Sequence, residues 1–146
     1  MGYRSNVRII TSKKGFEELQ KQVKKILDKK SYNFNLLDDP SILVKGRNGV
    51  LIGWDYIKWY EYSDFKDVDA INEALAYLSE KNIGYRFARI GESYDDFEER
   101  NEDGKDDDYL PYPSVIREFD DEYIKQELNY DANKETVKGV NNEALL

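Results

Sequence analysis

The order in which strand-like and helix-like segments alternate constrains the fold of this chain more than any other feature. The order is strand, helix, two strands joined by a tight turn, helix and strand. We expect these elements at residues 6–10, 12–30, 41–45, 50–60, 67–82 and 85–90. Right-handed crossovers favour one arrangement of such elements. The order therefore predicts an α+β fold, a ferredoxin-like split βαβ sandwich (β-α-β-β-α-β) with a four-stranded antiparallel sheet and both helices on one face.

Local patterns support these assignments. Ser12 offers a hydroxyl that can cap the first helix, and Asp67 can cap the second. Between the two middle strands, the sequence 46–49 (GRNG) supplies residues that tolerate the positive φ angles of a tight turn. The first helix has apolar residues three and four apart, which are Phe16, Leu19, Val23, Ile26 and Leu27.

The long strand at 50–60 is apolar on both sides. Alternation places Trp54, Tyr56 and Tyr60 on one face and Ile57 and Trp59 on the other. Such a strand needs a covering on each face. In one interpretation the helices cover one face, and the segment after Asp108 covers the other with Leu110, Tyr112, Val115, Ile116 and Phe119. In the other, some aromatic side chains form an exposed contact patch.

Negative charge is concentrated after the last predicted strand, in an acidic C-terminal extension. Ten of the seventeen residues at 92–108 are acidic. Residues 92–122 carry a net charge of −11, so the rest of the chain, which is −8 overall, carries +3. We expect a single α+β domain at 1–128, with a short strand at 114–119 and a helical turn at 121–128, and a polar, flexible tail at 129–146.

The composition makes several kinds of chemistry improbable. The chain has no cysteine and no histidine, which removes thiolate metal sites, the commonest zinc ligand and the commonest general base. No nucleophile motif or glycine-rich phosphate loop is present. No apolar run approaches the ~18 residues of a membrane span. We therefore expect a soluble protein that is not an enzyme and uses no cofactor.

Two binding chemistries are partly matched. Glu99, Asn101, Asp103 and Gly104 fit places 1, 3, 5 and 6 of a calcium-binding EF-hand loop, but Leu110 stands where the bidentate Glu is required. The lysines of the first helix could contact phosphate, yet the negative net charge repels nucleic acid. A solvated lysine face, partly paired with the chain's own acids, is the better interpretation.

Two segments of the chain resemble a known group of proteins. The opening residues 1–5 (MGYRS) and the run 89–99 (RIGESYDDFEE) are similar to a group of small, mostly uncharacterised phage and prophage proteins. The resemblance implies a virus-encoded protein that works in the cytoplasm of a bacterial host. In that setting small acidic proteins, including anti-CRISPR and anti-restriction proteins, often block host enzymes that handle nucleic acids.

The acidic extension is therefore our candidate contact surface. Carboxylates spaced along a surface can occupy the Arg and Lys groove that a nuclease keeps for the phosphate backbone. We expect an inhibitor that binds a basic host protein and contacts neither nucleic acid nor membrane directly. Alternatives are an adaptor or regulatory protein whose acids maintain solubility, and an enzyme with a carboxylate-bound metal ion. The expected contact residues are Glu92, Tyr94, Asp95, Asp96, Glu98, Glu99, Glu102, Asp103, Asp106, Asp107, Asp108, Trp54 and Tyr56.

Overall fold

The computed structural model describes residues 2–60, 65–105 and 110–113. The chain divides into two units, Met1–Pro113 and Ser114–Leu146, and all the described residues belong to the first. The predicted strand at 114–119, the helical turn at 121–128 and the tail at 129–146 lie outside the described residues. So does the predicted domain boundary after residue 128.

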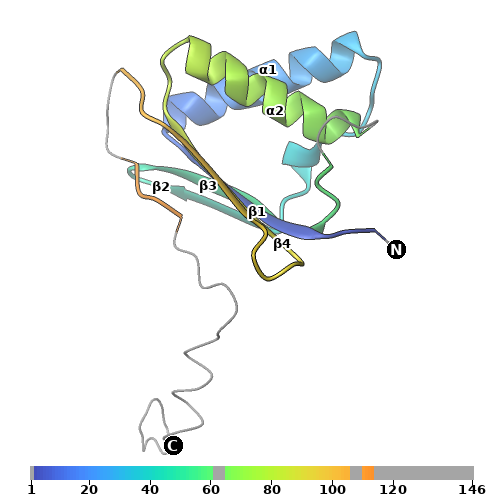
Figure 1. Cartoon of the computed structure of the whole chain (residues 1–146). Coiled ribbons are helices and arrows are strands. Elements are labelled where there is room, and N and C mark those ends of the chain that lie inside the picture. The colour runs from blue at the N-terminus through green and yellow to red at the C-terminus, as the bar shows by residue number, and fades with distance from the viewer. Residues whose placement is uncertain (1, 61–64, 106–109, 114–146) are drawn as a thin grey trace, which may run out of the picture. The chain divides into compact units, whose positions relative to one another are not determined.

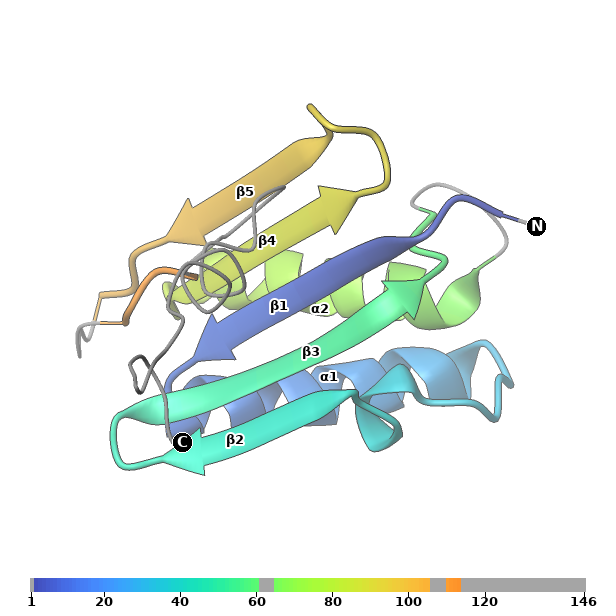
Figure 2. The same ribbon diagram turned by 90° about the horizontal axis from the view of Figure 1, so that it is seen from below.

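The described part of the chain is a five-stranded antiparallel sheet with two α-helices on one of its faces (Figures 1 and 2). The strand order across the sheet is β2-β3-β1-β4-β5. The predicted α+β class is confirmed. The elements are β1 (Ser5–Thr11), α1 (Lys13–Lys29), the short 3-10 helix η1 (Leu36–Asp38), β2 (Ile42–Gly46), β3 (Gly49–Ile57), α2 (Lys66–Glu80), β4 (Tyr85–Gly91) and β5 (Phe97–Glu102).

The prediction of a four-stranded sheet is wrong by one strand. Part of the acidic stretch forms β5, which pairs with β4 from Ile90↔Phe97 to Tyr85↔Glu102. Acidic residues are rare in strands, so the sequence did not predict a strand in this highly charged segment. The alternation is present nevertheless, because Glu98 and Arg100 are half-buried while Phe97 and Glu99 are exposed. The acidic stretch is therefore part of the sheet.

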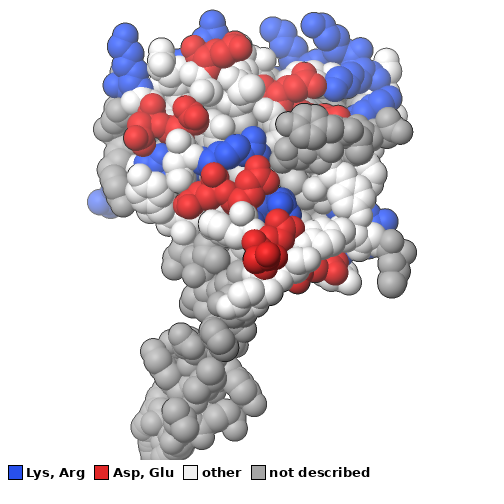
Figure 3. Space-filling model, viewed as in Figure 1, with Lys and Arg blue, Asp and Glu red and all other residues white. Residues whose placement is uncertain are grey.

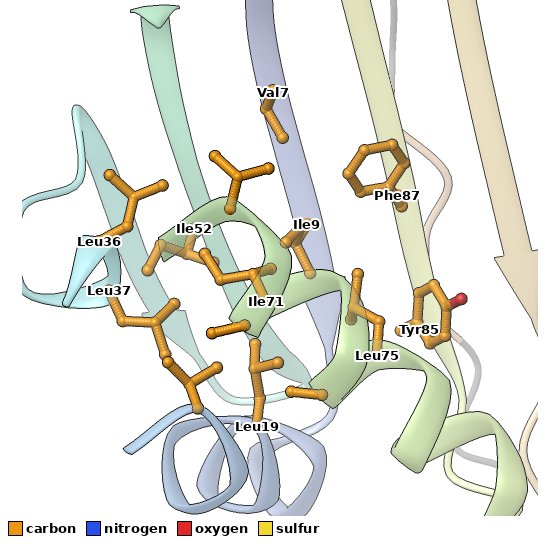
Figure 4. Packing of buried hydrophobic residues seen from close by; sticks show 14 of the residues in the cluster. Val7, Ile9, Leu19, Leu36, Leu37, Ile52, Ile71, Leu75, Tyr85 and Phe87 are labelled. Carbon is orange, nitrogen blue, oxygen red and sulfur yellow. The ribbon is translucent and has the colours of Figure 1, made fainter. Parts of the chain in front are cut away.

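The core lies between the sheet and the two helices (Figure 4). The apolar stripe of α1 packs against side chains such as Ile9, Ile52 and Phe87, which come from three neighbouring strands. The predicted cap of α1 is confirmed, since the Gly15 N–H donates to Ser12 Oγ at 3.0 Å. The predicted cap of the second helix at Asp67 is wrong, because the helix already begins at Lys66 and its N-cap residue, Phe65, makes no side-chain capping bond.

A substitution at Leu19 tests this packing. Leu19 is fully buried, and a Leu→Ala change in a core typically costs about 2 to 5 kcal/mol because it loses apolar contacts and leaves a cavity. We expect Leu19→Ala to lower the free energy of unfolding by about 2 to 4 kcal/mol in urea denaturation. The control is Lys24→Ala, which removes only an exposed pair with Asp28. Equal stabilities of the two variants would contradict the packing of α1.

The end of β3 departs from the predicted alternation. The strand ends at Ile57, and Tyr56 has a positive φ of 55°. This turn of the backbone returns Trp59 to the helix side, where its ring lies 5.7 Å from that of Trp54. Both tryptophans are buried, at 2% and 5% exposure, so the expectation that they lie on opposite faces is wrong.

The segment after residue 109 supplies part of the expected second covering. Leu110 is buried, and the ring of Tyr112 lies 4.2 Å from the guanidinium carbon of Arg86. Arg86 points away from the helices, because its neighbours Tyr85 and Phe87 belong to the core. The other residues expected in this covering, Val115, Ile116 and Phe119, lie outside the described residues.

Candidate partner-binding surface

Residues 92–103 form one structural unit, which we call the acidic hairpin. It consists of the turn that follows β4, the strand β5 and the first residue after it. At the far end of β5, the chain is held by the Lys105 N–H, which donates to the Asn82 carbonyl at 2.8 Å. Gly84 and Gly104 lie so close there that a Cβ on either would overlap the other's backbone. The hairpin is thus fixed at its open end.

Its turn is fixed by Arg89, which lies near the end of β4. The guanidinium binds Asp96 through two hydrogen bonds, of 2.7 and 3.1 Å, and binds Glu98 at 3.2 Å. It also donates to Ser5 Oγ at 3.0 Å. The hydrogen bond to Asp96 raises the pKa of Arg89, in spite of the opposing effect of burial, and Glu98 adds to this rise. The bidentate pair therefore stays charged and orients the turn.

The N-terminal segment completes this network. Tyr3 Oη donates to Asp96 at 2.6 Å and accepts from the Ser93 N–H at 2.9 Å. The Arg4 N–H donates to the Glu92 carboxylate at 2.6 Å. At Gly91 there is no room for a side chain, since a Cβ would overlap Asp96 and the Tyr3 hydroxyl. The fold thereby joins the N-terminal segment to the turn that follows β4.

The acids of the hairpin divide into two groups by what their carboxylates contact. Asp96 and Glu98 are held by Arg89, and both are partly buried. The carboxylates of Asp95 and Glu99 are exposed, and neither makes a hydrogen bond or ion pair with another residue of the described chain. Only the second group is free to bind a partner. A charge reversal across all four residues would disturb the fold as well as the surface.

Three further predicted contact acids are exposed but bind other residues of the chain. Glu92 accepts from Arg4, and Glu102 accepts from Ser79 Oγ at 3.2 Å. Asp103 pairs with Arg86 at 3.0 Å, although its own side chain is 81% exposed. Asp106, Asp107 and Asp108 lie outside the described residues.

The three predicted aromatic contact residues differ in position. Trp54 is 2% exposed and donates from Nε1 to the Leu36 carbonyl at 3.0 Å, so it belongs to the core. Tyr94, in the hairpin turn, is 69% exposed. Tyr56 is 70% exposed. Two of the three therefore lie at the surface.

Arg4 joins Tyr56 to the hairpin turn. Its guanidinium lies 5.0 Å from the centre of the Tyr56 ring and donates to the Tyr56 carbonyl at 3.4 Å, while its backbone N–H binds Glu92. The strand pairing agrees with this arrangement, because Ser5 of β1 pairs with Ile57 of β3 on one side and with Gly91 of β4 on the other. Tyr56 and the turn thus flank the start of β1 at the same end of the sheet. Sequence reasoning missed this role of Arg4, and its only signal was membership of the opening motif.

The partial EF-hand match has a different structure. Glu99 and Asn101 lie in the extended strand β5 and pair with Ala88 and Arg86, so these residues do not form a calcium-binding loop. Within residues 2–60, 65–105 and 110–113, no three acidic side chains are grouped in a way that could hold a metal ion.

The lysine face of α1 is paired with acids at several points. Lys30 binds Glu73 at 3.0 Å, and Lys24 binds Asp28 at 3.4 Å. In Figure 3, basic side chains project along the top of the molecule, where the helices lie, and acidic and basic side chains lie next to one another below them. This arrangement agrees with a solvated face.

Comparison with protein-family models, with curated proteins and with solved structures gives no match to this chain. In the described part of the chain, neither helix combines the length and the apolar character needed to cross a membrane.

Proposed function

We propose that this chain is a non-enzymatic binding protein that contacts a basic partner protein through the exposed acids of the acidic hairpin. The observation that carries the proposal is the contrast between Asp95 and Glu99, which point into solvent, and Asp96 and Glu98, which are bound by Arg89. The internal ion pairs hold the turn in one conformation. The two outward carboxylates then form a preorganised negative surface, and preorganisation lowers the entropy cost of binding.

The resemblance to phage proteins suggests the class of partner. A host protein that handles nucleic acid, such as a CRISPR or restriction effector, has a basic groove for the phosphate backbone. An acidic surface can occupy that groove and exclude the nucleic acid. The proposed activity is therefore inhibition by competition, carried out in the cytoplasm of a bacterial host. The partner contacts are Asp95 and Glu99, with the exposed residues Glu92, Tyr94 and Tyr56 beside them.

An adaptor or regulatory protein is the second candidate. The observation that favours it is the number of hairpin acids already satisfied within the chain: Glu92, Asp96, Glu98, Glu102 and Asp103 all bind other parts of the domain. In this alternative the acids stabilise the hairpin and keep the protein soluble, and the partner is another phage protein.

The double charge reversal Asp95→Lys/Glu99→Lys tests the proposal. We expect it to weaken partner binding by at least about tenfold, because it places like charges against a basic surface while leaving the Arg89 network intact. The tagged protein would be incubated with a lysate of phage-infected bacteria, and the retained proteins would be quantified by mass spectrometry. Binding should fall as salt rises, since exposed charges are screened beyond about 8 Å at physiological ionic strength. Added duplex DNA should compete.

The matched control is Glu17→Lys/Glu80→Lys, which changes the net charge equally at exposed acids of α1 and α2. It should bind as the wild type does. If both double variants lose binding to the same extent, net charge rather than the hairpin surface determines the interaction. If the hairpin variant retains full binding and a phage protein is the main species captured, the adaptor function is the correct one.

We also propose a finer description of the fold, a ferredoxin-like core. The elements β1, α1, β2, β3, α2 and β4 follow one another in the order of a split βαβ sandwich. In our proposal these six elements form a ferredoxin-like core, and β5 is an addition at its edge that carries the contact surface. An experimental structure would test this description.

A further inference from the structure

We infer that a groove beside Tyr56 receives an arginine side chain of the partner. The inference rests on the proposed function, since it assumes a basic partner protein, and it names the chemistry by which that partner is recognised. The groove has a volume of about 390 Å³ and lies at the end of β3. Arg4 lines it, so it adjoins the turn of the acidic hairpin, which the same residue binds.

The walls of the groove are aromatic. Tyr56 is 70% exposed and Phe34 is 45% exposed, and both line the groove with the half-buried ring of Phe65. Exposed aromatic rings are costly in solvent, and they are typical of contact surfaces. A flat guanidinium group stacks on such rings, whereas a lysine ammonium ion is a compact, strongly hydrated charge.

The fold holds Tyr56 outward at a cost in conformational energy. A positive φ is unfavourable in a residue other than glycine, and Tyr56 has a φ of 55°. Two contacts from the start of the chain compensate: the Tyr56 N–H donates to Asn6 Oδ1 at 2.8 Å, and Arg4 donates to the Tyr56 carbonyl. The Arg4 guanidinium already lies over the ring. Arg4 is thus an example, within the chain, of a guanidinium group that binds this ring.

One carboxylate of the groove is free to bind a cation. Three carboxylates line it, and two of them are engaged: Asp55 pairs with Arg8 at 2.8 Å, and Asp67 accepts from the Val68 N–H at 2.9 Å. The carboxylate of Asp39 is exposed and binds no other described residue. The cations of the groove are Arg4, which is committed to Tyr56, and Lys58. Asp39 is therefore the counter-ion for an arginine that stacks between the rings.

Titration of the full chain with hexa-arginine and with hexa-lysine tests this inference. The two peptides carry equal charge, so net charge alone does not distinguish them, and variants of the groove separate its preference from the preference that the hairpin carboxylates have for guanidinium groups. The aromatic groove should make the wild type bind hexa-arginine about fivefold more tightly in calorimetry. Phe34→Ser and Asp39→Asn should each lower this ratio clearly below the wild-type value. The matched controls Leu43→Ser, at a residue 44% exposed, and Asp38→Asn should preserve the ratio.

The outcomes separate the inference from the proposed function. Equal binding of both peptides by the wild type would overturn the groove inference and leave the proposed function standing. Preserved discrimination in a folded Phe34→Ser or Asp39→Asn variant would also overturn the groove inference. Binding of neither peptide would contradict both, because no basic ligand would then be recognised. Circular dichroism verifies the fold of each variant.

Discussion

Replacing Trp54 with alanine is expected to lower the free energy of unfolding by about 3 to 5 kcal/mol, the range typical of large aromatic residues in a core. The side chain is buried, packs 5.7 Å from the ring of Trp59 and donates to the Leu36 carbonyl. The substitution removes apolar contacts and leaves a buried carbonyl without its donor. Urea denaturation followed by far-UV circular dichroism measures the loss.

Two further variants identify the cause. Trp54→Phe keeps a ring but removes the donor, and we expect a loss of about 1 to 3 kcal/mol from the unpaired carbonyl. Tyr56→Asn removes the exposed ring, and asparagine tolerates a positive φ, so its stability should be close to that of the wild type. A Trp54→Ala variant as stable as Tyr56→Asn would place Trp54 at the surface.

Removal of the Arg89 guanidinium is the second large effect. Arg89→Met should lower the free energy of unfolding by about 2 to 4 kcal/mol, because it removes the guanidinium that binds the partly buried carboxylates of Asp96 and Glu98 and leaves Glu98 with its weaker pair to Arg100 at 3.3 Å. The Tyr3 hydroxyl would then face a carboxylate that is no longer oriented. Chemical denaturation measures the loss, and amide hydrogen exchange at Ser93 reports local opening of the turn.

The control for this variant is Arg47→Met, at an exposed position in the turn between β2 and β3. It removes the same charge and should change stability by less than about 0.5 kcal/mol. In the pair of variants Asp96→Asn and Arg89→Met/Asp96→Asn, a coupling energy near zero would show that the ion pair contributes nothing to stability. Equal losses at Arg47 and Arg89 would contradict the network in the same way.

The periodic elements were predictable from local sequence. The stripe of α1, its cap at Ser12 and the tight turn at 46–49 depend on residues that are close in the chain, and the structure confirms all three. The position of Trp59 was not predictable, because it depends on one backbone angle at Tyr56. That angle is stabilised by Asn6, 50 positions away.

The strand β5 was not predicted, for a related reason. Considered alone, this acidic sequence predicts a solvated loop, since Glu, Arg and Asn have a low intrinsic preference for a sheet. Their partners come from other elements: Glu98 binds Arg89 of β4, Glu102 binds Ser79 of α2, and Arg100 binds Asn72 of α2. These tertiary contacts stabilise the segment as an edge strand of the sheet, although its sequence alone resembles a solvated, charged loop. The division into free and engaged acids follows from the same contacts and could not be predicted from sequence.

The network around Arg89 also sets when the candidate surface can form during synthesis. Ser5 and Arg89 are 84 positions apart, and Tyr3 and Asp96 are 93 apart. At ordinary translation rates, roughly 5 to 20 s pass between the emergence of the first and the last of these residues from the ribosome. Contacts of such large separation are also slow to form in the free chain. The segments that form both helices and the first hairpin thus emerge before the contact surface can form, and a truncated product that stops before β5 would lack the surface.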